Sequence, residues 1–310
     1  MRSARFIAGD WGTSHLRLAL CAVDGAVLAE TRGPGAAACA GRFADVFAHA
    51  VAPWAEHGPL PALLCGMVGS RLGWKEAPYL PCPVSLERLA AGCIAPDFAG
   101  VQIVPGLACT NPLGAPDFLR GEETQVLGAL TLDARLREGH HRLVLPGTHS
   151  KWLQLEQAQV QRFQTFVTGE LYAALHAHNV LVNAATAGGG DALDGAFLHG
   201  LQRSVAAAPD ALLAQLFECR ARRLAGELAD DEASDFLSGL LIGHELRRGL
   251  AQNTDPSTAI CLIGTTALTQ RYAYALAVFD MDSYCLDGSE AAIAGLAAVY
   301  RQCGREESLR

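Results

Sequence analysis

The sequence predicts an α/β protein made of two similar halves around a cleft, with sheets covered by helices. Short apolar strands and helical segments follow one another along the chain, which is the pattern of sheets packed under helices. Each half opens with a strand, a turn that contains Gly and Thr, and a second strand. Half of the 310 residues are hydrophobic, which is enough to fill the cores of about two domains.

The first half is expected to begin as a β-meander. Asp24-Gly25 predicts a hairpin turn between its second and third strands, because both residues tolerate the positive φ that a two-residue turn requires. In chain order, the expected elements are strands at 5–9, 16–23 and 26–30, a helix at 42–57, strands at 63–65 and 101–104, and a long helix at 118–137.

The second half is expected to repeat the strand–turn–strand opening and then to be mainly helical. The boundary is placed near Gly139, which divides the chain into residues 1–138 and 139–310. The expected elements are strands at 142–145, 152–155 and 158–167, helices at 169–178, 194–206, 209–225 and 233–251, a buried strand at 259–263, and helices at 266–277 and 289–302.

Composition excludes several classes of protein. The chain carries 24 Lys and Arg against 32 Asp and Glu, a formal net charge of −8, whereas a nucleic-acid binder needs a basic face. No run of about 18 apolar residues occurs, so no membrane-spanning helix is expected. The ten cysteines form no Cys-x-x-Cys pair and no secretory signal precedes Gly9, so we expect reduced thiols in a cytoplasmic protein.

The first candidate site is the turn Gly9-Asp10-Trp11-Gly12-Thr13-Ser14. Gly12 allows the backbone to approach a ligand closely, and the N–H groups of such a turn can bind phosphate oxygens. The Thr13 and Ser14 hydroxyls add donors, and the Asp10 carboxylate could hold Mg²⁺ directly or through water. The same residues would also make an ordinary polar hairpin turn.

The second candidate site is the turn Pro146-Gly147-Thr148-His149-Ser150-Lys151, which repeats features of the first. It does not fulfil the Walker A pattern. Gly147 and Thr148 nevertheless stand where the first turn has its own Gly and Thr, and Lys151 adds a positive charge. A type II turn with a surface lysine is the alternative.

A third glycine turn follows the buried strand 259–263, where Gly264 precedes a helix. A flat ring could lie against the backbone at this point because glycine has no side chain. A tight strand-to-helix turn without a ligand explains the pattern equally well.

Two carboxylates, Glu122 and Glu123, stand near the start of the helix expected at 118–137. Adjacent helical residues point to different faces, so one of the two could face a cleft and act as a general base or orient a metal-bound water. The helix macrodipole also favours acidic residues in a first turn, and spacing alone favours that structural role.

Residues 66–79 follow the buried strand 63–65 and gather Gly, Ser, Arg, Lys, Trp and Tyr side chains. Loops at strand ends are where open α/β sheets bind ligands, and Arg71 is suited to a bidentate grip on a carboxylate. A solvated loop is the alternative.

Together and in this order, the motifs resemble those of the 2-dehydro-3-deoxygalactonokinase (2-keto-3-deoxygalactonate kinase) family, in the superfamily of sugar kinases, Hsp70 and actin. The two Gly-Thr turns and Gly264 are similar to its two phosphate motifs and its adenosine motif. The matching segments span nearly the whole chain: 9–14, 66–71, 74–79, 120–125, 145–152, 168–171 and 237–243. The resemblance implies a two-domain actin-like ATPase (ribonuclease H-like) fold with a central cleft.

The resemblance further implies ATP-dependent phosphorylation of 2-dehydro-3-deoxy-D-galactonate on its 6-hydroxyl in galactonate breakdown, with ATP and Mg²⁺. Asp10 would contact Mg²⁺, and Asp10, Glu122 or Glu123 would be the catalytic carboxylate. The residues expected to bind ATP and its phosphates are Gly12, Thr13, Ser14, Gly147, Thr148, Lys151 and Gly264. The residues expected to bind the sugar acid are Ser70, Arg71, Trp74 and Arg120, with Lys151 as a further candidate for its carboxylate.

Two other functions stay open at this point. One is a polyphosphate or nucleotide phosphohydrolase of the same fold, which would release phosphate without a sugar acceptor. The other is a non-catalytic nucleotide-switched protein, against which the loop at 66–79 argues because a switch needs no sugar-facing loop. The expected partner is a small sugar acid, without nucleic acid or membrane, and a homodimer is possible.

Overall fold

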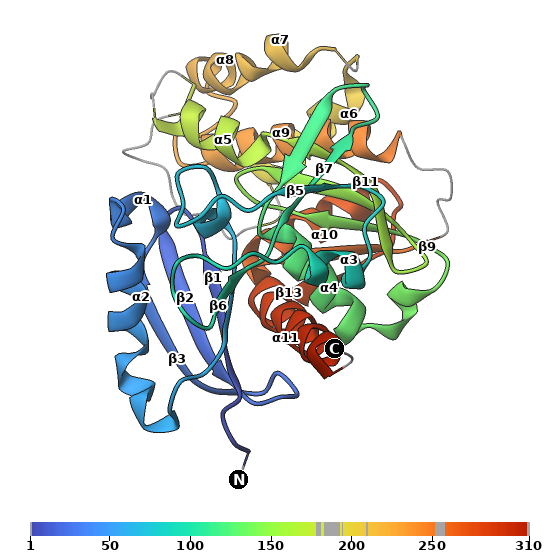
Figure 1. Ribbon diagram of the computed structural model, residues 1–310. Coiled ribbons are helices and arrows are strands. Elements are labelled where there is room, and N and C mark those ends of the chain that lie inside the picture. Colours follow the sequence, from blue (N-terminus) through green and yellow to red (C-terminus); the bar gives the residue numbers. More distant parts are fainter. Residues whose placement is uncertain are drawn as a thin grey trace. The chain divides into compact units, whose positions relative to one another are not determined.

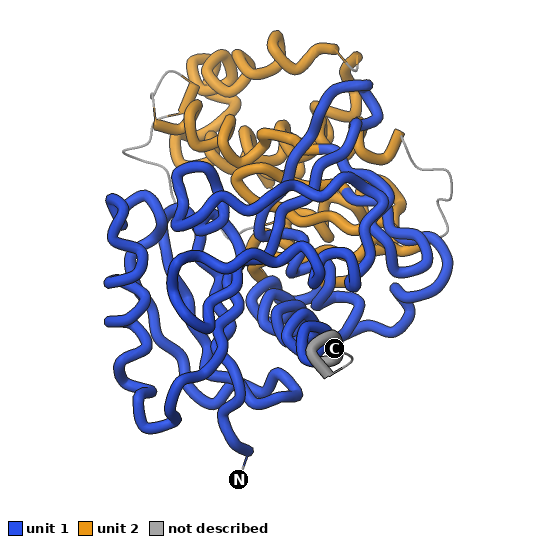
Figure 2. Tube along the Cα trace, viewed as in Figure 1, with its two compact units in different colours: residues 1–141, 153–164, 286–310 blue, residues 142–152, 165–285 orange. Residues whose placement is uncertain are grey.

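The computed structural model describes residues 2–177, 181–182, 193, 195–208, 210–251 and 258–308. The chain forms two compact units (Figure 2): unit 1 contains residues 1–141, 153–164 and 286–310, and unit 2 contains residues 142–152 and 165–285. The first break follows His141, close to the boundary predicted near Gly139. Two later segments, 153–164 and 286–310, are grouped with unit 1, although the sequence placed them in the second half.

Unit 1 contains a five-stranded sheet with the strand order β3-β2-β1-β4-β6 and a three-stranded sheet with the order β5-β7-β8 (Figure 1). Its strands are β1 (Phe6–Trp11), β2 (His15–Cys21), β3 (Val27–Pro34), β4 (Ala62–Cys65), β5 (Tyr79–Pro81), β6 (Val101–Ile103), β7 (Gly106–Thr110) and β8 (Pro116–Leu119). Its helices are α1 (Ala36–Cys39), α2 (Phe43–Val51), η1 (Ala52–His57), η2 (Met67–Gly69), α3 (Leu86–Ala91), α4 (Glu122–Leu132), η3 (Ala134–Arg137) and α11 (Gly288–Ser308).

The five-stranded sheet of unit 1 begins with the predicted meander. β2 pairs antiparallel with both β1 and β3, and Gly25 in the hairpin turn has a φ of 88°. β1 is buried along nearly its whole length because β4 joins it in parallel on the other side. Parallel strands end at the same edge of a sheet, so the register places Asp10 beside Cys65 there.

Unit 2 contains most of the second five-stranded sheet, which has the order β11-β10-β9-β12-β13. Its strands are β9 (His140–Leu145), β10 (Ser150–Glu156), β11 (Gln159–Phe166), β12 (Ile260–Gly264) and β13 (Ser283–Asp287), of which β10 and β11 continue into residues 153–164. The helices are α5 (Thr168–Ala177), α6 (Ala196–Ala206), α7 (Leu212–Leu216), α8 (Glu218–Ala225), α9 (Ala233–Leu250) and α10 (Thr266–Val278).

The two five-stranded sheets repeat one topology, as the sequence predicted. In each, the first three strands lie in reverse chain order, and the next strand joins the first one in parallel: β4 beside β1, and β12 beside β9. The Gly-Thr turns therefore occupy equivalent places, between the first and second strand of each sheet.

Some expected elements were wrong. The segment 118–137, predicted as one helix, contains the end of β8, then α4, then η3. Gly121, with a φ of 105°, separates β8 from α4, which begins at Glu122. The helix predicted at 209–225 is divided at Phe217 into α7 and α8. The three-stranded sheet was not predicted, because its strands have three to five residues and lack a clear apolar alternation.

Glycines let two pairs of helices pack closely. In unit 1, a Cβ at Gly295 of α11 would lie 1.8 Å from the carbonyl oxygen of Thr124 in α4, and one at Gly128 would lie 1.7 Å from that of Ala291. In unit 2, Gly239 of α9 meets the backbone of Phe197 in α6 in the same manner. Residues 237–243, one of the segments on which the family resemblance rests, therefore contribute to the close packing of these helices.

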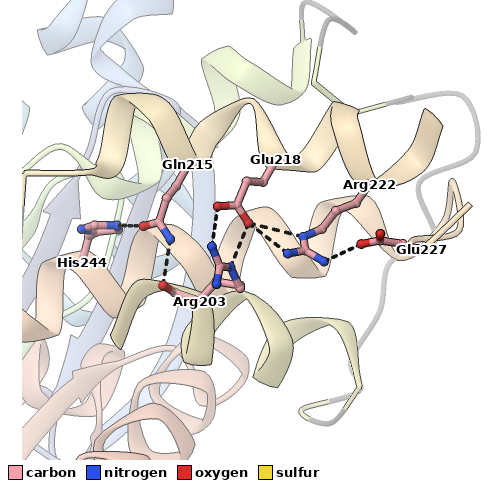
Figure 3. A network of polar contacts seen from close by, with 6 residues as sticks. All are labelled: Arg203, Gln215, Glu218, Arg222, Glu227 and His244. Carbon is pink, nitrogen blue, oxygen red and sulfur yellow. Dashed lines mark hydrogen bonds and ion pairs between the residues drawn. The ribbon is translucent and has the colours of Figure 1, made fainter. Parts of the chain in front are cut away.

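A polar network joins helices α6, α7, α8 and α9 of unit 2 (Figure 3). Glu218 accepts hydrogen bonds from both Arg203, at 2.8 and 2.9 Å, and Arg222, at 3.2 and 3.3 Å. Gln215 donates to the carbonyl oxygen of Arg203 and contacts His244. Because the charges within the network are paired, we interpret it as structural.

Within the described part of the chain, no helix is long and apolar enough to cross a membrane. None of the ten cysteines, all of which lie within the described residues, forms a disulfide in the structure.

Candidate active site

Three segments of unit 1 meet at the carboxyl ends of β1 and β4. Gly66, with a φ of 89°, lies so close that a Cβ there would be 2.9 Å from the carbonyl oxygen of Trp11 and 3.3 Å from Oδ1 of Asp10. A Cβ at Gly121 would be 3.4 Å from Cα of Gly66. The structure thus brings together three segments that the sequence singled out separately, around Asp10, Gly66 and Gly121.

Asp10 is half-buried near the end of β1. Burial raises the pKa of its carboxyl group, and Arg17, its antiparallel partner on β2, opposes the shift. A cavity of about 160 Å³ opens beside it, lined also by Arg17, Arg32 and Ser289. The carboxylate thus has free space next to it for a small ligand.

Glu122 and Glu123 both support the start of α4, as the structural alternative predicted. The Gly121 amide donates to Oε2 of Glu123 at 2.6 Å, and the Arg120 amide donates to Oε2 of Glu122 at 3.1 Å. Glu123 is 1% exposed, and burial, with a smaller contribution from Glu122, raises its pKa to about 8. Glu123 is therefore mostly protonated at neutral pH and can donate a hydrogen bond there.

Buried polar atoms without partners gather in this part of unit 1. Among the described residues, four buried side-chain atoms have no hydrogen-bond partner, and three of them are Ser70 Oγ, Arg120 Nη1 and Glu123 Oε1. Buried polar groups are normally satisfied, so three orphaned atoms in one region indicate a ligand site. Two of these residues, Ser70 and Arg120, are predicted to bind the sugar acid.

Arg120 is held rigidly. Its Nη2 donates to the carbonyl oxygen of Ala77 at 2.7 Å, its Nε to the Tyr79 hydroxyl at 3.3 Å, and its guanidinium lies 4.3 Å from the centre of the Tyr79 ring. A Cβ at Gly69 would be 2.7 Å from Nη1 and 2.8 Å from Cγ2 of Ile103, so the glycine leaves room for the guanidinium in this position. This support leaves Nη1 as the guanidinium nitrogen that is available to a ligand.

The other predicted sugar-acid residues lie in different surroundings. Arg71 is exposed, whereas Trp74 packs in an aromatic cluster with Trp11, Phe43 and Phe47 at centroid distances of 5.8 to 6.5 Å. Trp74 therefore has a clear role in the core of unit 1.

The first Gly-Thr turn is a tight turn backed by a helix start. The Gly12 amide donates to the carbonyl oxygen of His15 at 3.0 Å, while Thr13 and Ser14 are exposed. A Cβ at Gly35, just before α1, would be 2.2 Å from the carbonyl carbon of Ser14. Only glycine allows this contact.

The second Gly-Thr turn repeats this arrangement in unit 2. A Cβ at Gly169, in the first turn of α5, would be 2.3 Å from the carbonyl oxygen of Gly147. The Glu170 amide donates to the carbonyl oxygen of Thr148 at 2.9 Å. His149 also contacts Glu170, with 2.6 Å between Nε2 and Oε2. The sequence did not single out Gly35, and it singled out Gly169 only as part of the matching segment 168–171, although each glycine follows the third strand of its sheet.

Gly264 lies beside the second turn, whereas Lys151 is turned away from solvent. A Cβ at Gly264 would be 3.5 Å from the carbonyl oxygen of Pro146, because β12 and β9 end side by side. Lys151 is 5% exposed, and its Nζ donates to the Thr165 hydroxyl at 2.8 Å. The alternative of a surface lysine is therefore wrong.

A magnesium site would depend mainly on Asp10. No group of three or more His, Cys, Asp or Glu suited to a metal occurs among the described residues. Mg²⁺ is usually held by one or two carboxylates together with substrate phosphates and waters, so a single well-placed carboxylate fits this mode of binding.

Comparisons with known proteins agree with the motifs along the whole chain. The chain is 39% identical over 302 residues to the probable 2-dehydro-3-deoxygalactonokinase DgoK1 of Rhizobium meliloti, which covers 96% of both chains. It is 35% identical over 303 residues to the 2-dehydro-3-deoxygalactonokinase of Escherichia coli, covering 96% of this chain and 98% of that one.

Solved structures support the fold. A crystal structure from Sinorhizobium meliloti, named for the same activity, has a TM-score of 0.87 and 37% identity and covers 96% of this chain and 98% of its own. Component A of the (R)-2-hydroxyglutaryl-CoA dehydratase of Acidaminococcus fermentans has a TM-score of 0.53 at 10% identity, covers 97% of this chain and 100% of its own, and shows the fold alone. The two-domain actin-like ATPase fold expected from the motifs is confirmed. The model of the 2-keto-3-deoxy-galactonokinase family matches residues 10–299, and the chain belongs to this family.

Proposed function

We propose that this protein transfers the γ-phosphoryl group of ATP to the 6-hydroxyl of 2-dehydro-3-deoxy-D-galactonate in D-galactonate catabolism. The observation that carries the proposal is the identity of 35% and 39% to two relatives named for this activity, over 96% of the chain. The orphaned polar atoms of unit 1 give a second, physical argument, because a sugar acid would satisfy them.

The sugar acid is bound by unit 1 in this proposal. The Arg120 guanidinium and the Ser70 hydroxyl offer buried donors to its carboxylate, and protonated Glu123 offers a third donor to an oxygen of the substrate. Arg71 adds a positive charge from the exposed loop. Donors to charged groups form the stronger hydrogen bonds, which favours an acid over a neutral sugar.

The ATP phosphates are bound by backbone amides and hydroxyls of the Gly-Thr turns. Gly147 and Thr148 belong to unit 2, where a Cβ at Gly147 would meet nothing within 4 Å, so its backbone is open to a ligand. Gly264, next to this turn, faces the adenosine. Gly12, Thr13 and Ser14 supply the corresponding turn of unit 1. Fixed donors of this kind stabilise the charge that spreads over the equatorial oxygens during phosphoryl transfer.

Carboxylates of unit 1 orient the acceptor and the metal ion. Asp10 would hold Mg²⁺, which supplies charge neutralisation on the β- and γ-phosphates when bound. Burial raises the pKa of Glu123 to about 8, so Glu123 already carries a proton at neutral pH and is poorly suited to accept another. Asp10 and Glu122 are therefore the two candidates for the base that receives the proton of the 6-hydroxyl.

A coupled assay of ATP consumption tests the proposal. The acceptors are 2-dehydro-3-deoxygalactonate, its gluconate epimer, common hexoses and no acceptor, and we expect the highest kcat/KM for the first. A preference for a hexose would refute it. Phosphate release that is independent of any acceptor would instead support a phosphohydrolase.

The use of ATP favours a cytoplasmic location, and a homodimer remains a prediction that light scattering can check.

A further inference from the structure

A buried carboxylate of unit 2, Glu245 in α9, is surrounded by hydroxyl and indole donors and has no role in the proposed reaction. Its Oε1 accepts from Nε1 of Trp152 at 2.8 Å, and its Oε2 accepts from the Tyr272 hydroxyl at 2.7 Å. The contacts to the Trp152 indole and the Tyr272 hydroxyl thus use both oxygens of the carboxyl group. Ser150 joins this group through Tyr272, because its Oγ lies 2.9 Å from the Tyr272 oxygen. Burial raises the pKa of the Glu245 carboxyl, and the nearby hydroxyls of Thr168 and Ser150 oppose that rise.

Two of these hydroxyl side chains flank the second Gly-Thr turn. Ser150 directly follows the turn and is the first residue of β10. Thr168 is the first residue of α5 and directly precedes Gly169, which packs against the carbonyl oxygen of Gly147. Glu245 thus connects the end of the turn to the helix start that backs it.

Glu245 cannot itself touch a ligand from this position. Its residue is 3% exposed, Tyr272 is 2% exposed and Ser150 is fully buried. The helix that carries it is held against the sheet, because Arg142 donates to the carbonyl oxygen of Gly249 at 2.9 Å and Gly249 packs on the Trp152 ring. The carboxylate therefore acts on the turn through Ser150 and Thr168.

We propose that Glu245 is a positioning residue for the phosphate-binding turn Gly147-Thr148, holding its two supports, Ser150 and Thr168, in one geometry. The inference rests on the proposed function of this turn. Glutamine at this position would keep one acceptor oxygen for the Trp152 indole but would replace the acceptor of the Tyr272 hydroxyl by an NH₂ group, so the Tyr272 and Ser150 hydroxyls would have to reorient. Glu245→Gln would therefore weaken the connection between Ser150 and Thr168 while preserving the size of the side chain.

A matched control is available at Glu218. It also lies in unit 2 and accepts hydrogen bonds through both carboxylate oxygens, from Arg203 and Arg222 (Figure 3), but no hydrogen bond among the described residues joins it to the turn. Glu218→Gln makes the same chemical change and controls for a general loss of stability. Tyr272→Phe is a second, milder variant, since it removes a single donor from Glu245.

The test compares KM for ATP with KM for the sugar acid, together with the ATP Kd from calorimetry without acceptor. For Glu245→Gln we expect the KM and Kd for ATP to rise about tenfold, because the Tyr272 hydroxyl loses its acceptor oxygen, and the KM for the sugar acid to stay within about twofold. Tyr272→Phe should shift ATP affinity in the same direction by less. Glu218→Gln should leave ATP affinity unchanged even where it lowers the Tm.

Three results would overturn the inference: an unchanged ATP Kd in folded Glu245→Gln, an equal rise of both KM values, or an equal loss of ATP affinity in Glu218→Gln. If Glu245→Gln does not fold, Tyr272→Phe decides, and a wild-type ATP Kd in that variant contradicts the inference. Direct ATP binding separates this inference from the proposed function, because a wild-type protein that binds ATP but phosphorylates no sugar acid would refute only the latter.

Discussion

At the scale of single residues, burial decides which of several suitable side chains can bind the substrate or carry a proton. Arg71 and Arg120 are equally suited to a carboxylate by residue type, yet only Arg120 is fixed by neighbours and keeps a buried nitrogen without a partner. Glu122 and Glu123 are adjacent in sequence, but Glu123 is fully buried, and burial raises its pKa to about 8, so it is mostly neutral at pH 7. These differences in role come from the surroundings of each residue.

Arg120→Lys should raise the KM for the sugar acid about tenfold or more and leave the KM for ATP within about twofold. Lysine provides no planar fork, so it cannot keep the contacts to Ala77 and Tyr79 and still reach a ligand. Steady-state kinetics with both substrates checks this, with Arg71→Ala as the comparison, in which a smaller rise is expected. A larger effect at Arg71 would contradict the assignment of Arg120, and Ser70→Ala offers a second variant if Arg120→Lys lowers the Tm.

Glu123→Gln should reduce the pH dependence of stability. The pKa of Glu123 is raised from 4.5 to about 8 in the folded protein, so the folded state prefers the protonated form. Its contribution to stability is then fully present below pH 4.5 and is lost as the pH rises through about 8. Glutamine resembles the protonated form at every pH, so the Tm of the variant should fall less over this window. Parallel Tm profiles for both proteins would show that Glu123 is not the group that titrates.

At the scale of elements, the two Gly-Thr turns depend on the helices that follow the third strand of each sheet. Gly35 and Gly169 bring the starts of α1 and α5 into direct contact with the turns. The turn sequence alone suggests a phosphate site, but the backbone geometry of each turn is held by a segment about twenty residues away in the chain. Each Gly-Thr turn therefore functions together with the helix start that contacts it.

Gly169→Ala should weaken ATP binding more than sugar-acid binding. Its Cβ would lie 2.3 Å from the carbonyl oxygen of Gly147, which no Cβ tolerates, so the second turn must shift. We expect a rise of about tenfold in the KM for ATP. Gly304→Ala is the control, because a Cβ there would meet nothing within 4 Å. Unchanged ATP affinity in Gly169→Ala would mean that the turn adapts without loss.

At the scale of the whole molecule, the last helix completes the first unit. α11 packs on α4, α3 and β1 of unit 1, and Arg17 of β2 donates to Ser289 at its start, at 2.9 Å. Residues from both ends of the chain therefore form one core. Periodicity identified this helix, but periodicity carries no information about which unit it joins.

A chain that ends at Asp287 should lose cooperative unfolding, because α4 and β1 would expose apolar surface that α11 covers. A chain that ends at Gly304 keeps the crossing at Gly295 and should unfold with a Tm close to that of the full protein. Thermal denaturation followed by circular dichroism separates the two. A cooperative transition in the shorter chain would show that unit 1 does not need α11.

The sequence by itself determined the features that depend on local patterns. Apolar runs and turn residues predicted the meander, the hairpin at Asp24-Gly25, the repeated sheet and most helices, since strand and helix periods and positive-φ turns are properties of neighbouring residues. The order of the motifs was specific enough to predict the family. The short strands of the three-stranded sheet were not predicted, because so few residues cannot show a clear hydrophobic pattern.

Only the tertiary structure decided which side chains are buried together. The orphaned nitrogen of Arg120, the raised pKa of Glu123, the contact of Lys151 with Thr165 and the donors to Glu245 all involve residues brought together by packing. Burial and hydrogen bonding set the charge and the availability of a polar group, and both depend on long-range contacts that no local pattern encodes.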